Sequence, residues 1–248
     1  MFKADNIYRK DAVEGLSSLG DNSVDLIISD PPYNIAAKNK LTLKEGKILS
    51  TLEVWGQWDQ MNPFDYDVFI MRLLSEYYRV LKDGGAMYMF TAQQDNGHFI
   101  RQAKARGFTY QNQLAIVKKS PLPSFRKSNW RNAYELCMYL TKGKQETFNF
   151  LSQRECVNVF SYANGRRGTK HPTEKPLEFI KRLVQVSSNP GALVVDPFMG
   201  SGTTAVACQE LDRHFIGFEI NKSYIKIAKA RLRIFNKLKQ HGGKSPNA

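Results

Sequence analysis

A glycine-rich turn between an apolar segment and a helix constrains the fold of this chain more than any other feature. The segment 194–205 reads VVDPFMGSGTTA: an apolar strand pattern ends at Asp196, and Gly200, Gly202 and Ala205 have GxGxxA spacing before a predicted helix. Glycines at these positions let the backbone turn tightly and approach a ligand, and the free N–H groups at the helix start can bind it. The pattern is typical of open α/β sheets that bind nucleotide-like cofactors.

An acid at the end of the following strand strengthens this interpretation. Glu219 stands nineteen residues after Gly200 and closes the predicted strand 215–219. A carboxylate at that distance can accept hydrogen bonds from the hydroxyls of a ribose. The spacing suits a dinucleotide cofactor almost as well as an adenosine-containing methyl donor, so both remain open from the turn alone.

A second motif, DPPYN at 30–34, directly follows the apolar segment 24–29 (VDLIIS), which has the length of a buried strand. The motif is therefore expected at the carboxyl edge of the sheet, where ligands bind. Its prolines lack N–H donors and stiffen the turn, which leaves the Asp30 carboxylate and the Pro31 carbonyl as acceptors beside the Tyr33 ring. Two acceptors that hold the hydrogens of an aryl amine favour a pyramidal nitrogen with an available lone pair. The aromatic ring can hold a flat base by stacking.

Apolar runs of strand length alternate with helical patterns along the chain. Strands are predicted at about 7–10, 24–29, 86–90, 113–118, 134–140, 192–195 and 215–219, with shorter ones at 147–150 and 157–162. Helices are predicted at about 11–19, 62–81, 93–106, 176–188, 203–211 and 222–239, with Asn62 as a cap and Gly84-Gly85 as the end of the second. This alternation predicts an α/β fold with a doubly wound, largely parallel sheet.

Two segments lack such patterns. Residues 34–62 are polar and lysine-rich without periodicity, which predicts a long mobile loop. The tail 241–248 (HGGKSPNA) is expected to be disordered.

Basic side chains outnumber acidic ones, with 36 Lys and Arg against 23 Asp and Glu and a net charge of +13. Such an excess favours a polyanionic partner, and nucleic acid is the first candidate. Basic residues gather in the connection 118–131 (KKSPLPSFRKSNWR), where Phe125 and Trp130 are placed to stack on or wedge between bases, and again in a glycine-containing loop. The DNA-phosphate contacts expected from these two clusters are Arg126, Lys127, Arg131, Arg166, Arg167 and Lys170.

Several classes of protein are disfavoured by composition. Three distant cysteines, Cys137, Cys156 and Cys208, exclude a disulfide framework, and neither they nor the four histidines have metal-ligand spacing. No run approaches the roughly 18 apolar residues that a membrane span requires. We therefore expect a soluble, cytoplasmic protein with no metal and no membrane partner.

Three motifs, in this order, resemble the β-class amino-methyltransferases that act on DNA, such as the small adenine-N6 enzymes of restriction–modification systems. They are DPPYN at 30–34, HPTEKP at 171–176 and DPFMGSGTT at 196–204, and the resemblance covers essentially the whole chain. It implies a Rossmann-like fold: a doubly wound, mostly parallel seven-stranded sheet with one antiparallel hairpin. It also implies a single catalytic domain over 1–240, with a short target-recognition region at about 119–170.

The resemblance also implies roles for individual residues. The catalytic site would consist of Asp30, Pro31, Pro32 and Tyr33. The residues that would bind S-adenosyl-L-methionine are Asp11, Asp30, Thr173, Lys175, Asp196, Phe198, Gly200, Ser201, Gly202, Thr203 and Glu219. Among these, Glu219 would bind the ribose, Asp11 would lie near the donor's adenine, and Thr173 and Lys175 would bind the methionine carboxylate.

The function implied is methylation of the N6 amine of adenine in a specific duplex DNA sequence, by base flipping and direct transfer. N4-cytosine methylation is the nearest alternative, because the two amines are chemically alike; in the family, Asp at the first motif position favours adenine. An RNA amino-methyltransferase and a dinucleotide oxidoreductase are further alternatives, although an oxidoreductase would leave DPPY and the basic loops unused. A non-catalytic DNA-binding module would leave the cofactor turn unexplained. The expected partners are double-stranded DNA, a second copy in a homodimer and a cognate restriction endonuclease.

Overall fold

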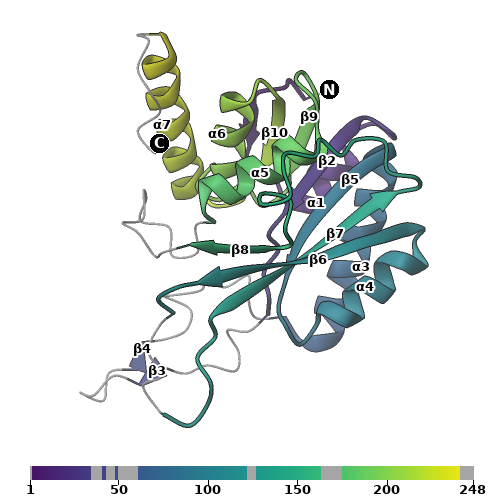
Figure 1. Cartoon of the computed structure of the whole chain (residues 1–248), viewed down its shortest axis with the longest axis vertical. Coiled ribbons are helices and arrows are strands. Elements are labelled where there is room, and N and C mark those ends of the chain that lie inside the picture. The colour runs from purple at the N-terminus through teal and green to yellow at the C-terminus, as the bar shows by residue number, and fades with distance from the viewer. Residues whose placement is uncertain are drawn as a thin grey trace.

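The computed structural model describes residues 2–34, 41–42, 48–49, 61–121, 127–162 and 175–240, and Figure 1 shows how their elements are arranged. In chain order the elements are β1 (Asn6–Tyr8), α1 (Ala12–Ser17), β2 (Val24–Ser29), β3 (Leu41–Thr42), β4 (Ile48–Leu49), α3 (Pro63–Val80), β5 (Leu81–Thr91), α4 (Asn96–Ala105), β6 (Phe108–Lys118), β7 (Tyr134–Lys142), β8 (Val159–Tyr162), α5 (Leu177–Ser187), β9 (Leu193–Asp196), α6 (Thr203–Glu210), β10 (His214–Phe218) and α7 (Lys222–Gln240).

One large sheet organises these elements. Its strand order is β1-β10-β9-β2-β5-β7-β6-β8, so it has eight strands, one more than the seven expected. The first five strands in this order, β1, β10, β9, β2 and β5, are parallel to one another. The strand β7 runs antiparallel to both β5 and β6, and β8 lies parallel to β6. The α/β fold with a mostly parallel sheet and one antiparallel hairpin is therefore confirmed, and β8 is the additional edge strand.

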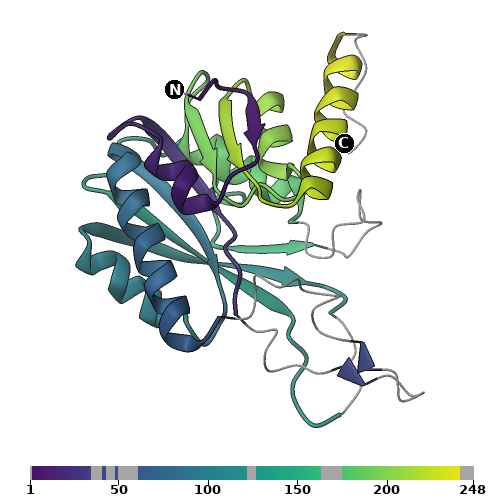
Figure 2. The same ribbon diagram turned by 180° about the vertical axis from the view of Figure 1, so that it is seen from behind.

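Helices cover both faces of the sheet and form two hydrophobic cores. The helices α5, α6 and α7 pack on one face, and α1, α3 and α4 pack on the other, which Figure 2 shows from behind. Successive side chains of β2 alternate between the two: Leu26 and Ile28 belong to the first core and Ile27 to the second. A strand buried on both faces must be apolar throughout, which explains the sequence VDLIIS.

The helix α3 begins as predicted and ends at Val80, within one residue of the predicted end. Asn62 accepts a hydrogen bond from the Asp65 N–H and Pro63 occupies the first turn. The strand β5 starts at once at Leu81, so Gly84-Gly85 lies inside a strand, and the prediction that it ends the helix is wrong. The pairing of β2 with β5 is irregular there, and Gly84 has φ of +77°, so the glycines permit a bulge that sequence reasoning interpreted as a break.

The segment 147–150, for which a strand was predicted, is irregular. Its Asn149 instead binds the end of α5: the backbone N–H donates to the Val186 carbonyl, and the side-chain amide donates to the carbonyls of Gln185 and Ser188. These bonds replace the ladder of a sheet. The second predicted strand in this region exists as β8.

Two other predictions fall largely outside the described residues. Within 34–62, the structure adds only the antiparallel pair β3 and β4 to the two ends of the segment. The tail 241–248 is not among the described residues. Of the helices that are described, none combines the length and hydropathy that crossing a membrane would require.

Candidate active site

The two sequence motifs meet where the sheet reverses its winding. The strand β2 continues through α3 to β5 on one side, whereas its neighbour β9 continues through α6 to β10 on the other. Ile27 of β2 lies opposite Val195 of β9, so Asp30 and Asp196 leave adjacent parallel strands at the same carboxyl edge. In open α/β sheets, ligands bind at such a switch point. Two motifs that are remote in sequence thus form one site.

A side chain of α3 and the backbone just before this helix hold the DPPYN turn in shape. The Tyr66 hydroxyl donates to the Pro32 carbonyl over 2.9 Å. The Asn34 amide both donates to the Met61 carbonyl and accepts from the Met61 N–H, each over 2.8 Å, while Asn34 has φ of +53°. The middle and the end of the turn are therefore held by α3 and by the residue that precedes its cap.

A buried hydrogen bond supports the turn from below. The Ser29 and Tyr77 hydroxyls lie 2.7 Å apart, and both residues are fully buried. Since Ser29 directly precedes Asp30, this bond anchors the last strand residue before the acid.

Asp30 is engaged at both carboxylate oxygens. The Tyr33 hydroxyl donates to its Oδ1 over 2.7 Å, and the Lys175 ammonium lies 2.8 Å from its Oδ2. Burial, together with the charge of Asp30, raises the pKa of Tyr33 well above its ordinary value. A neutral hydroxyl therefore faces Asp30.

Lys175 was expected at the methionine end of the donor, and its ammonium lies among acids beside the first motif. It contacts Asp30, it donates to Glu135 Oε2 over 2.8 Å, and its Nζ lies 3.3 Å from the Tyr33 hydroxyl and 4.5 Å from the Phe90 ring centre. Burial opposes the charged form, but Asp30, Tyr33 and Glu135 outweigh it and raise the pKa of Lys175. Lys175 is thus a largely buried ammonium ion.

Sequence reasoning missed Glu135. It lies near the start of β7, between Lys175 and Lys118 of β6, and forms ion pairs with both. Burial would raise its pKa, but the two lysines lower the pKa to about 2. The signal was available, because Glu135 is an acid in the otherwise apolar strand segment YELCMYL.

The glycine-rich turn has the conformation that its sequence requires. Gly200 and Gly202 have φ of +51° and +85°, in the left-handed region that favours glycine. A Cβ on Gly202 would stand 2.7 Å from the Cβ of Ala228 in α7. Both the backbone conformation at Gly202 and the close approach of α7 therefore favour glycine at this position.

Two carboxyl groups shape this turn from within. Asp196 accepts from the Phe198 N–H over 2.9 Å and from the Thr204 hydroxyl over 2.6 Å. Glu219 accepts from the Gly200 N–H over 2.9 Å. Burial raises the pKa of Asp196 to about 7 and also raises the pKa of Glu219. With Asp30 at the same edge of the sheet, these acids make this edge suitable for a cationic ligand.

Arg231 of the last helix, α7, forms hydrogen bonds with the glycine-rich turn. This contact was not predicted from the sequence. Arg231 Nη1 donates to the Ser201 carbonyl and to the hydroxyls of Ser201 and Thr203 over 3.1 to 3.2 Å. Both turn residues were expected to bind the donor, and both are buried. The basic helix α7 therefore contributes to the architecture of the site.

The remaining predicted site residues are distributed as follows. Asp11, after β1 at the same edge, caps α1 by accepting from the Val13 N–H over 2.9 Å. Phe198 packs edge-on against Phe69 with ring centres 6.3 Å apart. Lys127 and Arg131 are exposed in the connection from β6 to β7. Predicted residues outside the described part of the chain are Arg126, Arg166, Arg167, Lys170 and Thr173.

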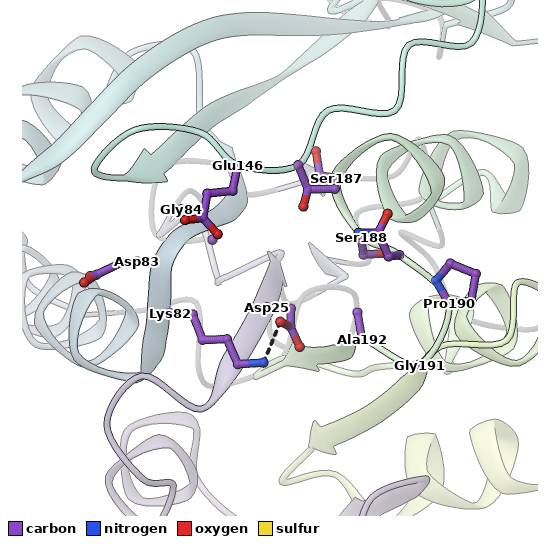
Figure 3. Close-up of a pocket in the computed structure, with 13 residues that line it drawn as sticks. Asp25, Lys82, Asp83, Gly84, Glu146, Ser187, Ser188, Pro190, Gly191 and Ala192 are labelled. Carbon is purple, nitrogen blue, oxygen red and sulfur yellow. Dashed lines mark hydrogen bonds and ion pairs between the residues drawn. The ribbon is translucent and has the colours of Figure 1, made fainter.

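A pocket of about 320 Å³ lies at the opposite, amino edge of the sheet (Figure 3). It is lined by Asp25, Lys82 and Glu146, and Asp25 is held by Lys82 over 2.6 Å and by the Leu193 N–H over 2.8 Å. It is separate from the motifs described above. Among the residues that the structure describes, no cluster of His, Cys, Asp and Glu could hold a metal ion.

Comparison with known proteins gives consistent matches over nearly the whole chain. A family model described as DNA methylase (N6_N4_Mtase) matches residues 24–230. The Type II methyltransferase M.HinfI of Haemophilus influenzae is 31% identical over 92% of this chain and 68% of that protein. The Type II methyltransferase M.HpaI of Haemophilus parainfluenzae is 31% identical over 89% of this chain and 72% of that protein.

Solved structures agree with these matches. The complex of M1.HpyAVI with S-adenosylmethionine superposes with a TM-score of 0.70 at 27% identity, covering 92% of this chain and 98% of that chain. The PvuII DNA methyltransferase, described as cytosine-N4-specific, has a TM-score of 0.72 at 18% identity and covers 98% of this chain and 95% of that one. The second likeness concerns the fold alone.

Proposed function

The chain belongs to the DNA methylase family, and on that premise we propose that it methylates the N6 amine of adenine within a specific sequence of duplex DNA. Family membership makes it a site-specific DNA methyltransferase that uses S-adenosyl-L-methionine and acts on an exocyclic amine, N6 or N4. The observation that carries the adenine proposal is the Asp30-Pro31-Pro32-Tyr33 turn beside the glycine-rich turn, with Asp at its first position.

Asp30 and Pro31 would prepare the amine for transfer. The Asp30 carboxylate and the Pro31 carbonyl would each accept one N–H of the amine, which frees the nitrogen lone pair from the ring. A carboxylate has about four acceptor sites, so the hydrogen bonds from Tyr33 and Lys175 leave capacity for the amine. The lone pair would form the new N–C bond as the S–C bond of the donor breaks, and the nitrogen would then lose a proton to solvent.

The acids at this edge of the sheet suit a donor that carries a positive charge. S-adenosyl-L-methionine supplies a methyl group on a sulfonium sulfur, which keeps the S–C electron pair when the methyl group leaves. Asp196, Glu219 and Asp30 would offset the positive charge of the bound molecule, and a bound cation would in turn stabilise the charged forms of Asp196 and Glu219, which burial disfavours. Gly200 and Gly202 would allow the close approach.

The proposed DNA binding is argued from the basic residues at the catalytic edge and from the need to bring the target base to Asp30. A base inside a duplex is inaccessible, so the target nucleotide must flip out of the stack, and Tyr33 would then hold its ring. Lys127 and Arg131 lie in the connection from β6 to β7, at the catalytic edge, and would contact phosphates. We assign Arg126, Arg166, Arg167 and Lys170 the same role.

Two partners complete the proposal. The relatives are named Type II methyltransferases, which supports an accompanying restriction endonuclease of the same specificity. The short recognition region 119–170 favours a homodimer, and light scattering of the purified protein tests this directly.

Product analysis tests the proposed reaction. Wild type is incubated with S-adenosyl-L-methionine and unmethylated genomic DNA, and the nucleosides are weighed after digestion. We expect N6-methyladenine from wild type and a loss of about 100-fold or more in Asp30→Asn, with much of the donor binding retained. N4-methylcytosine instead would support the cytosine alternative, and the absence of both from wild type would refute DNA amine methylation.

A matched control exists on the same strand. Asp25 lies at the other end of β2 and pairs with Lys82 over 2.6 Å. The side chains of Asp25 and Asp30 are equally exposed, at 28%. Asp25→Asn removes the same charge at the opposite edge of the sheet and should leave the transfer rate unchanged. Equal losses in Asp25→Asn and Asp30→Asn would contradict the catalytic assignment of Asp30.

A further inference from the structure

Four charged side chains from separate elements form a continuous ion chain that ends at the first motif. Lys118 closes β6, Glu135 lies in β7, Lys175 precedes α5, and Asp30 follows β2. The contacts run Lys118–Glu135, Glu135–Lys175 at 2.8 Å and Lys175–Asp30 at 2.8 Å. Positive and negative charges alternate along these four side chains. Neither Glu135 nor Lys118 belongs to the motifs that the proposed function uses.

Along this row of ion pairs, the side chains become less exposed to solvent from Lys118 to Lys175. The Lys175 side chain is 11% exposed, compared with 29% for Lys118. Isolated buried charges are costly and persist only when paired and hydrogen-bonded. Lys175 is held between two carboxylates and beside the Tyr33 hydroxyl, so its position depends on Glu135 as much as on Asp30.

Glu135 determines how Lys175 meets Asp30. An ammonium has three N–H donors, and Glu135 Oε2 engages it at 2.8 Å, the same distance as Asp30 Oδ2. Without the carboxylate of Glu135, Lys175 would have Asp30 as its one charged acceptor among these contacts. It would then compete with the amine of the base for the acceptor sites of Asp30.

We propose that Glu135 is a positioning residue for methyl transfer, which holds Lys175 between two carboxylates and thereby keeps Asp30 oriented and available to accept a hydrogen bond from the target amine. The inference rests on the proposed function and extends it to a residue outside the family motifs considered above. Lys118 completes the arrangement, because its ammonium balances the charge of Glu135 from the solvent side.

The test compares single-turnover methyl transfer at saturating donor with donor affinity. Glu135→Gln should slow transfer by about 10- to 100-fold, the effect of misplacing a reacting group, while the Kd for S-adenosyl-L-methionine changes little. Glu135→Asp, which keeps the charge, should recover part of the rate. An unchanged transfer rate in folded Glu135→Gln would overturn the proposal, as would a loss confined to donor affinity.

A matched control separates positioning from folding. Glu76 pairs with Arg79 over 2.6 Å, and its side chain is 22% exposed, compared with 23% for Glu135. Glu76→Gln should leave the transfer rate unchanged. If Glu135→Gln alone folds poorly, the double variant Lys118→Met/Glu135→Gln removes one charge of each sign and so does not leave Lys118 without the acid that it contacts. It too should transfer slowly with normal donor affinity, and a wild-type rate would overturn the proposal.

A double-mutant cycle with Lys175 tests the route of the effect. Because Glu135 acts on Asp30 through Lys175, Glu135→Gln should slow transfer little further in a Lys175→Met background, whereas multiplicative losses would overturn the proposal. Wild type is assayed first. A wild type that methylates neither base refutes the proposed function, whereas an active wild type with an unaffected Glu135→Gln refutes only this inference.

Discussion

Replacing Gly202 by alanine should reveal how tightly α7 closes over the glycine-rich turn. Two penalties add at this position. Left-handed backbone costs an L-residue about 1–2 kcal/mol, and Gly202 has φ of +85°. The added methyl would stand 2.7 Å from the Cβ of Ala228, and overpacking of this kind costs about 1–3 kcal/mol. We therefore expect Gly202→Ala to lower the free energy of unfolding by about 2–5 kcal/mol.

Gly191 isolates the first penalty from the second. Its φ is +80°, but a Cβ there would meet nothing within 4 Å. Gly191→Ala should therefore cost only the backbone strain of about 1–2 kcal/mol. Unfolding in urea, followed by circular dichroism, measures both variants.

The difference between the two variants reports the close approach alone, which we expect to be about 1–3 kcal/mol. The double variant Gly202→Ala/Ala228→Gly should recover part of this loss, because it removes the opposing methyl group at the expense of a glycine within α7. Equal destabilisation by Gly202→Ala and Gly191→Ala would refute the reasoning, since the contact with α7 would then contribute nothing.

Three further predictions concern the supports of the site. Tyr77→Phe and Ser29→Ala should each lower the free energy of unfolding by about 1–3 kcal/mol by leaving a buried hydroxyl unpaired, and the double variant should lose less than the sum; additive losses in urea unfolding would contradict this. Burial raises the pKa of Asp196 from 3.8 to about 7, and a carboxyl group with a higher pKa in the folded state stabilises most at low pH. Its contribution should therefore be lost as the pH rises from about 4 to about 7, so the Tm of Asp196→Asn should rise relative to wild type over that range, and a constant difference would contradict the burial effect. Arg231→Met should weaken S-adenosyl-L-methionine binding about tenfold by loosening Ser201 and Thr203, and calorimetry that finds unchanged affinity would show that α7 does not support the turn.

The features that could be predicted from sequence are those that neighbouring residues decide. An apolar run such as β2 can be predicted as a strand buried on both faces from its own residues, without reference to the rest of the chain. The Asn62 cap and the left-handed glycines of the turn follow from local backbone chemistry in the same way. Gly84-Gly85 shows the limit, because the same two residues suit a helix end and a strand bulge, and the pairing of β5 with β2 decides between them.

The alternation of strands and helices, the two motifs and the identity of their acids follow from the order of residues along the chain. The folded arrangement is needed to know that Lys175 contacts Asp30, that Glu135 lies between two lysines, and that Arg231 reaches the glycine-rich turn. The physical reason is range. Conformational preferences act over a few residues, whereas an ion pair forms between side chains that the sheet brings together from distant parts of the chain.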